Sequence, residues 1–169
     1  MRFNILGVLA AVALVAACET APEGDASASG AGAATSSTTS TTSMSVYPGS
    51  QEDLVVNVGD RVFFSFDRFD LNEISRATLE KQAAWLAKYP TVTVTIEGHC
   101  DERGTREYNL GLGERRASAA KDYLVALGVS PARVNAVSYG EERPVALASN
   151  EAAWSQNRRS VTTVGGSGS

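Results

Sequence analysis

The sequence predicts an α/β fold, an α+β sandwich with one sheet of about four strands and helices on one face. Short segments of alternating or β-branched residues recur between residues 61 and 164, and a period of two is typical of strands. Longer segments separate them, with apolar residues three or four positions apart, as in amphipathic helices. The predicted order is therefore β-α-β-α-β-α-β, which is typical of two-layer α/β structures.

Residues 61–66 form the first predicted strand, because apolar and polar residues alternate there. One face of this strand carries Val62, Phe64 and Phe66. Asn72 is a favourable N-cap, so a helix is expected from this position to about Lys88. Pro90 ends that helix, because it pushes the preceding residue out of helical geometry.

Residues 91–97 form the clearest predicted strand, with valines and an isoleucine on one face and threonines on the other. A long helix is expected over 106–127, with Thr105 as its N-cap and Gly128 at its C-terminal end. The core face of this helix comprises Ala117, Ala120, Leu124 and Leu127. The remaining predicted elements are a strand over 134–139, a short helix over about 150–156 and a strand over 159–164.

Residues 1–17 predict a signal peptide. A basic start is followed by an apolar run over residues 5–17, which is shorter than the roughly 20 residues that a membrane-spanning helix needs. Residues 14–18, Leu-Val-Ala-Ala-Cys, resemble the lipobox of bacterial lipoproteins. We therefore expect cleavage before Cys18 and a lipid on that cysteine, which would anchor the chain to a membrane. The alternative is an ordinary export signal followed by a chance cysteine.

Residues 18–50 are expected to be the lipidated N-terminus and a disordered linker. The segment is rich in Ala, Ser, Thr and Gly and has no apolar period, so it cannot bury enough apolar area to offset its chain entropy. Its relaxed span would be about 30 Å and its stretched limit about 110 Å. The folded domain is expected over 51–164, and residues 165–169 are expected to be a flexible tail.

The charge and composition of the chain exclude two kinds of partner. The formal net charge is -4, whereas a protein that binds nucleic acid needs a basic surface, so no nucleic acid is expected. The chain has a single histidine, and a catalytic zinc site needs several ligands from separate positions. No metal and no cofactor are therefore expected.

Polar residues gather over 97–109, between a strand end and a helix N-terminus, which is a common place for a ligand. Asp101 is placed at the loop tip. Asn109 and Arg116 are seven residues apart, which puts them on one helix face about 10 Å apart, a face that we expect to differ from the core face. A carboxylate and a guanidinium at one groove suit a zwitterion, with ammonium on Asp101 and carboxylate on Arg116. The alternative, equally supported by the residues alone, is an ion pair between the loop and the helix.

Residues 98–117, beginning Gly-His-Cys-Asp-Glu-Arg-Gly-Thr, resemble the signature of OmpA-like peptidoglycan-binding domains, in particular those of peptidoglycan-associated lipoproteins. The resemblance runs from about residue 62 to residue 164 and includes the segments 64–67, 137–140 and 151–159. It implies an OmpA-like fold that binds the stem peptide of uncrosslinked peptidoglycan without cutting it. The diaminopimelate of that peptide carries a free ammonium and a free carboxylate.

The resemblance also implies which residues bind. Asp101 matches the ammonium partner, Arg116 the carboxylate partner and Asn109 a further polar contact. The rim and the binding loop match Phe66, Asp67, Arg103, Gly104 and Thr105. Arg158 lies in a matching segment, where a structural role is an alternative.

The resemblance further implies a location and partners. The chain would be lipid-anchored in the outer membrane, on its periplasmic face, and would tether that membrane to the cell wall. The implied partners are TolB and other Tol proteins, which link the chain to envelope integrity and cell division. The TolB site would overlap the peptidoglycan site and involve Glu102 and residues 139–140.

The alternative function is a peptidoglycan-remodelling hydrolase, which the residues do not favour. His99, Cys100 and Asp101 are consecutive, so they do not readily converge on one metal ion. At a strand end, His99 and Cys100 point to opposite faces, which argues against a cysteine peptidase. His99 is instead expected to order the loop by hydrogen bonding. If Cys18 is lipidated, Cys100 has no intrachain partner, and we expect it to be buried rather than joined to another chain.

Overall fold

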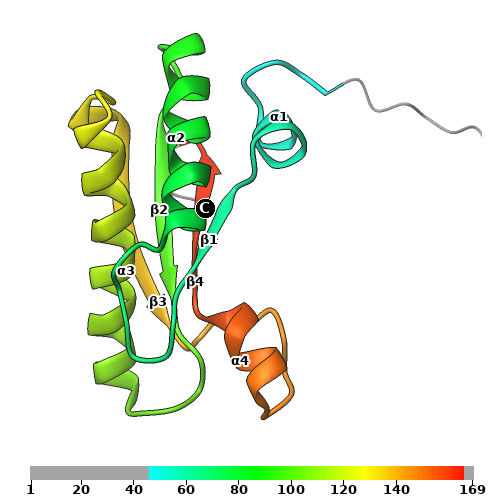
Figure 1. The fold of residues 1–169 in the computed structure, drawn as a ribbon, viewed down its shortest axis with the longest axis vertical. Coiled ribbons are helices and arrows are strands. Elements are labelled where there is room, and N and C mark those ends of the chain that lie inside the picture. Colours follow the sequence, from blue (N-terminus) through cyan, green and yellow to red (C-terminus); the bar gives the residue numbers. More distant parts are fainter. Residues whose placement is uncertain (1–45, 166–169) are drawn as a thin grey trace, which may run out of the picture. The chain divides into compact units, whose positions relative to one another are not determined.

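The computed structural model describes residues 46–165, which form one sheet with helices packed against it (Figure 1). The elements are, in order, α1 (Gln51–Asn57), β1 (Arg61–Phe63), α2 (Glu73–Lys88), β2 (Val94–His99), α3 (Arg106–Ala126), the 3-10 helix η1 (Pro131–Arg133), β3 (Val134–Gly140), α4 (Glu151–Asn157) and β4 (Arg159–Val164). The predicted signal peptide, Cys18, the predicted linker up to residue 45 and the tail from residue 166 lie outside the described residues.

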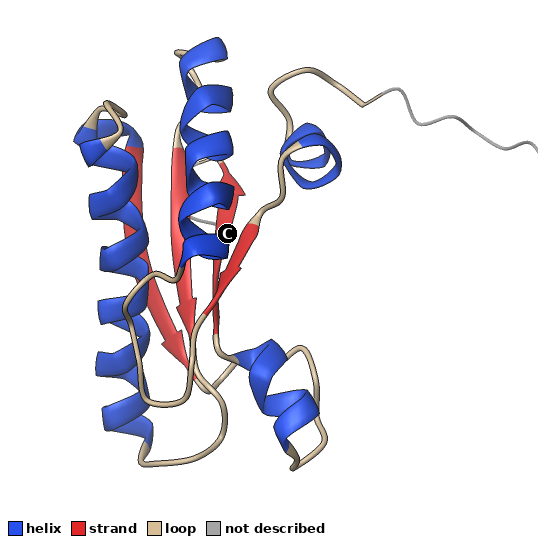
Figure 2. Cartoon of the chain, in the orientation of Figure 1, coloured by secondary structure: helices blue, strands red, loops and turns tan. Residues whose placement is uncertain are grey.

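The sheet has four strands in the order β1-β4-β2-β3. β4 runs antiparallel to both of its neighbours, whereas β2 and β3 are parallel. Helices α2 and α3 lie side by side on one face of this mixed sheet (Figure 2). The predicted α/β fold and its order from the first strand to the last are confirmed. Helix α1, which has seven residues, was not predicted.

The core lies between the sheet and the two long helices. Its largest buried apolar side chains include Leu54, Val62, Phe64, Leu79, Leu86, Val94, Ile96, Leu124 and Val134. The predicted caps form, since Asn72 accepts a hydrogen bond from the Ser75 N–H and Thr105 accepts one from the Tyr108 N–H. The predicted burial of Leu127 is wrong, because α3 ends at Ala126 and leaves this side chain 42% exposed.

Two strands differ from their predicted bounds. β1 ends at Phe63, because the chain then bends away and the Phe64 N–H donates to the Arg158 carbonyl at 2.9 Å. Phe66, which was expected on the buried face, is therefore 56% exposed beyond the sheet. β2 begins at Val94 and continues to His99, so it carries the chain directly into the polar loop.

Helix α1 closes the end of the sheet that lies opposite α4 (Figure 1). The Asp53 carboxylate accepts hydrogen bonds from the Gly49 N–H at 2.8 Å and from the Trp85 indole at 3.0 Å. The Gln51 amide accepts from the Val164 N–H at 2.6 Å and donates to the Thr162 carbonyl at 3.3 Å. It thereby satisfies backbone groups of β4 that β1 is too short to reach.

Within residues 46–165, no helix is both long and apolar enough to cross a membrane.

Candidate ligand-binding pocket

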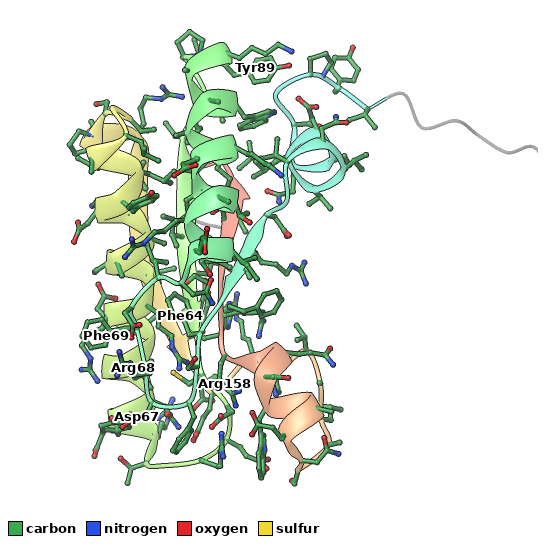
Figure 3. The ribbon with its side chains drawn as sticks, in the orientation of Figure 1. Phe64, Asp67, Arg68, Phe69, Tyr89 and Arg158 are labelled. Atoms are coloured by element: carbon green, nitrogen blue, oxygen red, sulfur yellow. The ribbon has the colours of Figure 1, made fainter. Side chains whose placement is uncertain are left out.

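The candidate site is a cavity of about 200 Å³ where β2 passes into α3. It is lined by Phe66, Asp67, Cys100, Asp101, Arg103, Gly104, Tyr108, Asn109, Leu112, Arg116 and Arg158. Every binding residue predicted from the sequence lines this cavity except Thr105, whose hydroxyl caps α3. Figure 3 shows Asp67 and Arg158 at this same end of the molecule, although 91 positions of the sequence separate them.

Arg116 is fully buried, with 0% of its surface exposed. Its guanidinium donates to three backbone carbonyls, those of Arg68 at 2.8 Å, His99 at 2.8 Å and Ser65 at 3.2 Å. The prediction that Arg116 lies on a face apart from the core is wrong. The buried face of α3 runs without a break from Leu124 through Arg116, because steps of three, four and seven residues all return to one helical stripe.

Among residues 46–165, no carboxylate makes a direct ion pair with Arg116. No carboxylate of residues 46–165 lies within 4.0 Å of its guanidinium, and burial lowers the pKa of Arg116. A fourth N–H donates to the Cys100 sulfur at 3.3 Å. A guanidinium has five N–H groups, so one remains for another acceptor. The direct partners of this buried cation are carbonyl oxygens and a thiol sulfur rather than a carboxylate, which makes the pocket receptive to an anion.

Asp101 was expected at the loop tip, but it lies two residues after the end of β2 and is buried. Its carboxylate pairs with Arg103 at 2.6 Å and with Arg158 at 3.2 Å, and not with Arg116. Burial alone would raise the pKa of Asp101, but hydrogen bonds from Arg103 and Arg158 hold that pKa below its usual range. The group is therefore an anion in the folded protein.

Asn109 is buried, and its amide holds the binding loop in place. Its side-chain N–H groups lie 3.3 Å from the Asp101 carbonyl, 3.2 Å from the Arg103 carbonyl and 2.5 Å from the Glu141 carboxylate. The structure therefore gives Asn109 a role in shaping the loop.

The predicted burial of Cys100 is confirmed, and burial raises the pKa of its thiol to about 11.

Aromatic side chains lie at the site, where Phe66 and Tyr108 line the cavity and Trp154 contacts Arg103. The Arg103 guanidinium lies between the rings of Phe66 and Trp154, at 4.0 Å and 4.1 Å from their centroids. The Tyr108 hydroxyl donates to Asp67, which holds the left-handed conformation with φ of 55°. Tyr108 and Trp154 were not predicted, because an aromatic residue on a short polar helix face gives no signal of its own.

His99 lies on the helix-free face of the sheet and does not order the loop as predicted. Its ring stacks on Tyr139 at 5.6 Å, and neither ring nitrogen has a hydrogen-bond partner in the part of the chain that the structure describes. Burial, together with the charges of Arg159 and Arg143, lowers the pKa of His99 from 6.5 to about 3.

Among residues 46–165, no three His, Cys, Asp or Glu side chains are grouped so that they could hold a metal ion.

Known proteins resemble this chain in both sequence and structure. The family model described as the OmpA family matches residues 63–158. A peptidoglycan-associated lipoprotein of Rhizobium meliloti is 59% identical over 122 residues, which cover 72% of this chain and 69% of that protein. One from Agrobacterium fabrum is 53% identical over 124 residues, with 73% and 70% of the two chains covered.

Solved structures of known proteins also resemble this chain. The peptidoglycan-associated lipoprotein from Burkholderia pseudomallei matches with a TM-score of 0.61 and 43% identity, over 63% of this chain and 90% of that chain. The C-terminal domain of Helicobacter pylori MotB matches with a TM-score of 0.59 over 64% of this chain and 85% of that chain. At 22% identity, this second match shows a shared fold alone. The chain belongs to the OmpA family, and its relatives in that family include peptidoglycan-associated lipoproteins.

Proposed function

We propose that the chain is a lipid-anchored outer-membrane protein whose pocket binds the peptidoglycan stem peptide non-covalently. One observation carries the proposal: the buried guanidinium of Arg116, which has no counter-ion among residues 46–165, lines the same cavity as the Asp101 carboxylate. A ligand with one carboxylate and one ammonium complements both groups. Diaminopimelate in an uncrosslinked stem peptide has this pair of charges.

The carboxylate of the ligand would accept the unused N–H of Arg116. Charge-assisted hydrogen bonds of this kind are among the strong ones in proteins, and burial strengthens them further because the local dielectric constant is low. The ammonium would lie against Asp101, which lines the cavity together with Phe66 and Arg103. The site would then distinguish diaminopimelate from lysine, which lacks the side-chain carboxylate.

The tether half of the proposal concerns Cys18 and the linker. The described chain begins beside α1, at the end of the sheet opposite α4 (Figure 1). The pocket is at the α4 end, where Arg158 lines it. A lipid on Cys18 would thus leave the pocket on the far side of the domain from its attachment. This arrangement favours a domain that holds the outer membrane to the cell wall.

TolB and other Tol proteins are the proposed protein partners, so the chain would act in the Tol-Pal system during cell division. A second cavity of about 220 Å³ supports this, because it includes residues 139–140, which the family resemblance assigns to the TolB site. It is lined by Arg106, Glu107, Leu110, Tyr139, Gly140, Glu141 and Glu142. The hydrogen bond from Asn109 to Glu141 joins the two cavities, so a protein bound at the second would disturb the loop of the first. Competition between TolB and peptidoglycan follows from this connection.

The arrangement of Cys100 and His99 does not support the alternative function as a hydrolase. The Cys100 thiol lies 3.3 Å from the Asn109 carbonyl oxygen and 3.3 Å from Arg116. His99 stacks instead on Tyr139. The two side chains are therefore not arranged as a nucleophile with its base.

The test is cosedimentation with isolated sacculi that contain diaminopimelate. We expect wild-type protein to pellet with sacculi and Asp101→Asn to remain in solution, with Glu80→Gln on α2 as the control that pellets normally. A soluble stem peptide ending in diaminopimelate should release the wild type, whereas the same peptide with lysine should not. Equal release by both peptides, or normal pelleting of Asp101→Asn, would refute the proposed site.

The anchor needs its own test, because it does not depend on the pocket. The variant Cys18→Ser should move from the membrane fraction to the soluble periplasmic fraction after cell lysis. If that variant stays with the membranes, the lipid-anchor proposal is wrong. Binding to sacculi should be the same for both forms.

A further inference from the structure

The Asp101 carboxylate is already saturated with donors. Arg103 supplies its backbone N–H at 3.1 Å, its Nε–H at 3.3 Å and its Nη2–H at 2.6 Å. Arg158 supplies a fourth donor, Nη1–H, at 3.2 Å. A carboxylate has about four acceptor positions. An ammonium from a ligand can therefore bind Asp101 only if one of these donors leaves.

Arg103 is the donor that can leave. Its side chain is 30% exposed, against 7% for Arg158. Arg158 is also held from two other directions, since it donates to the Phe64 carbonyl at 3.1 Å and to Glu151 at 2.6 Å. The Arg103 side chain has no hydrogen bond except those to Asp101 among the described residues.

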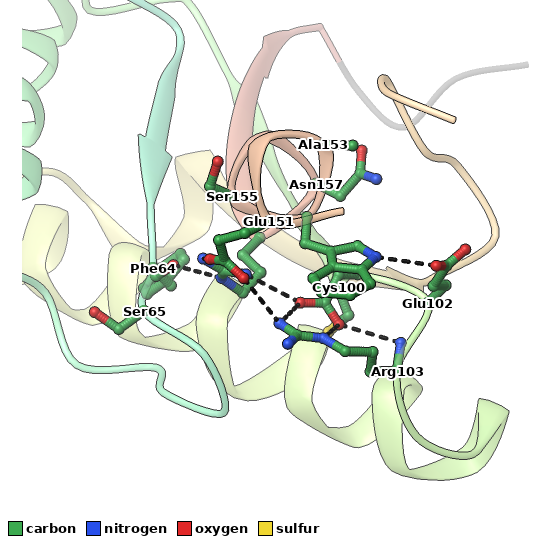
Figure 4. A network of polar contacts seen from close by, with 12 residues as sticks. Phe64, Ser65, Cys100, Glu102, Arg103, Glu151, Ala153, Ser155 and Asn157 are labelled. Carbon is green, nitrogen blue, oxygen red and sulfur yellow. Dashed lines mark hydrogen bonds and ion pairs between the residues drawn. The ribbon is translucent and has the colours of Figure 1, made fainter. Parts of the chain in front are cut away.

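A second carboxylate, that of Glu151, lies beside the Arg103 guanidinium and could accept a hydrogen bond from it. Glu151 Oε2 is 3.8 Å from Arg103 Nη2, while Glu151 Oε1 is occupied by Arg158. Figure 4 shows Arg103 and Glu151 facing each other across the network. The rings of Phe66 and Trp154 flank the guanidinium on both faces, so it can slide within this slot and keep both aromatic contacts.

We propose that Glu151 is a positioning residue that receives the Arg103 guanidinium when the ammonium of the ligand takes its place on Asp101. The inference rests on the proposed function, because it assumes that the pocket binds a ligand with an ammonium group. In the free protein, Arg103 occupies the cation position of the site. Binding is then an exchange of cations, and α4 contributes to affinity although Glu151 does not line the cavity.

The experiment measures the affinity of the soluble diaminopimelate stem peptide by calorimetry. Glu151→Gln removes the receiving charge, and we expect it to weaken binding about 2-fold to 5-fold, the range for a partly exposed ion pair. Glu151→Asp, which keeps the charge, should bind more tightly than Glu151→Gln. The control Glu80→Gln should match the wild type.

Arg103→Gln supplies the second arm, in a double-mutant cycle. Arg103→Gln loses whatever the Arg103 side chain contributes to the binding loop, but adding Glu151→Gln to it should change the affinity no further, because no guanidinium is left for Glu151 to receive. Equal weakening by Glu151→Gln in both backgrounds would overturn the inference, as would no weakening in either. Those results leave the proposed function standing, whereas a wild type that fails to bind the stem peptide would refute both.

Discussion

Gly98 of β2 and Gly113 of α3 meet with no space for a side chain between them. A Cβ atom on Gly98 would lie 1.9 Å from the Gly113 carbonyl oxygen, which is a backbone atom and cannot step aside. This contact sets how closely the long helix approaches the sheet. It thereby brings Arg116, one turn further along α3, within reach of the His99 carbonyl.

Replacing Gly98 should loosen the whole site. We expect Gly98→Ala to lower the free energy of unfolding by about 3 kcal/mol, since α3 must shift away from β2. Gly111 offers the matched control, because a Cβ there meets only the end of the Arg115 side chain at 3.5 Å. Gly111→Ala should raise the free energy of unfolding by up to about 1 kcal/mol, as alanine favours a helix interior. Denaturant titration measures both, and equal signs would contradict the role of this contact.

Arg116 should matter for stability as well as for binding. Arg116→Met leaves the carbonyls of Ser65, Arg68 and His99 without their donor, and buried unpaired groups cost roughly 1–3 kcal/mol each. We therefore expect a loss of about 3 kcal/mol or more in the free energy of unfolding. The neighbouring exposed residue gives the control, Arg115→Met, which should change this quantity by less than about 0.5 kcal/mol. A similarly small change in the free energy of unfolding in both variants would show that the hydrogen bonds from Arg116 to these three carbonyls do not stabilise the fold.

His99 should make the protein sensitive to acid. Its pKa falls from 6.5 to about 3 on folding, so between these values the unfolded chain binds a proton that the folded chain does not. Stability from this group is complete above about pH 6.5 and is lost as the pH falls towards 3. His99→Phe keeps a ring against Tyr139 but cannot titrate.

The check is the free energy of unfolding at pH 7 and pH 5. Between these values the wild type should lose about 1 to 2 kcal/mol more than His99→Phe. Carboxylates titrate in both proteins and cancel in the comparison. Parallel pH profiles would mean that His99 is protonated equally in the folded and unfolded chains.

Cys100 should be an unreactive thiol while the protein is folded. Burial raises its pKa from 9.0 to about 11, which lowers the thiolate fraction at pH 8 by about 100-fold. In a Cys18→Ser background, Cys100 is the single cysteine. Alkylation by iodoacetamide should therefore be at least about 100-fold slower in buffer than in denaturant. Comparable rates in the two conditions would show that the pocket opens readily to solvent.

Much of the fold follows from short-range patterns in the sequence. The caps at Asn72 and Thr105 and the strand that contains Val94 and Ile96 depend on residues within a few positions of one another. The loop residues of the pocket were predictable because polar residues cluster over 97–109, whereas Phe66 and Asp67 were expected only from the family resemblance. Helix α1 and the end of β1 at Phe63 were not predictable, because both depend on which backbone groups of β4 lack a hydrogen-bond partner within the sheet.

The tertiary structure alone decided how the charges are partnered. The sequence placed Asp101 and Arg116 near one another and suggested that they face the ligand or each other. In the folded chain Asp101 pairs with Arg158, 57 positions away, and Arg116 donates to carbonyls 17 to 51 positions away. Local propensity acts over about one helical turn, whereas an ion pair forms between whichever groups the packing of strands and helices brings together. The sequence by itself therefore determined most of the elements and the place of the site, and the packing that brings α3 and Arg158 to the end of β2 determined how the charges of the site are partnered.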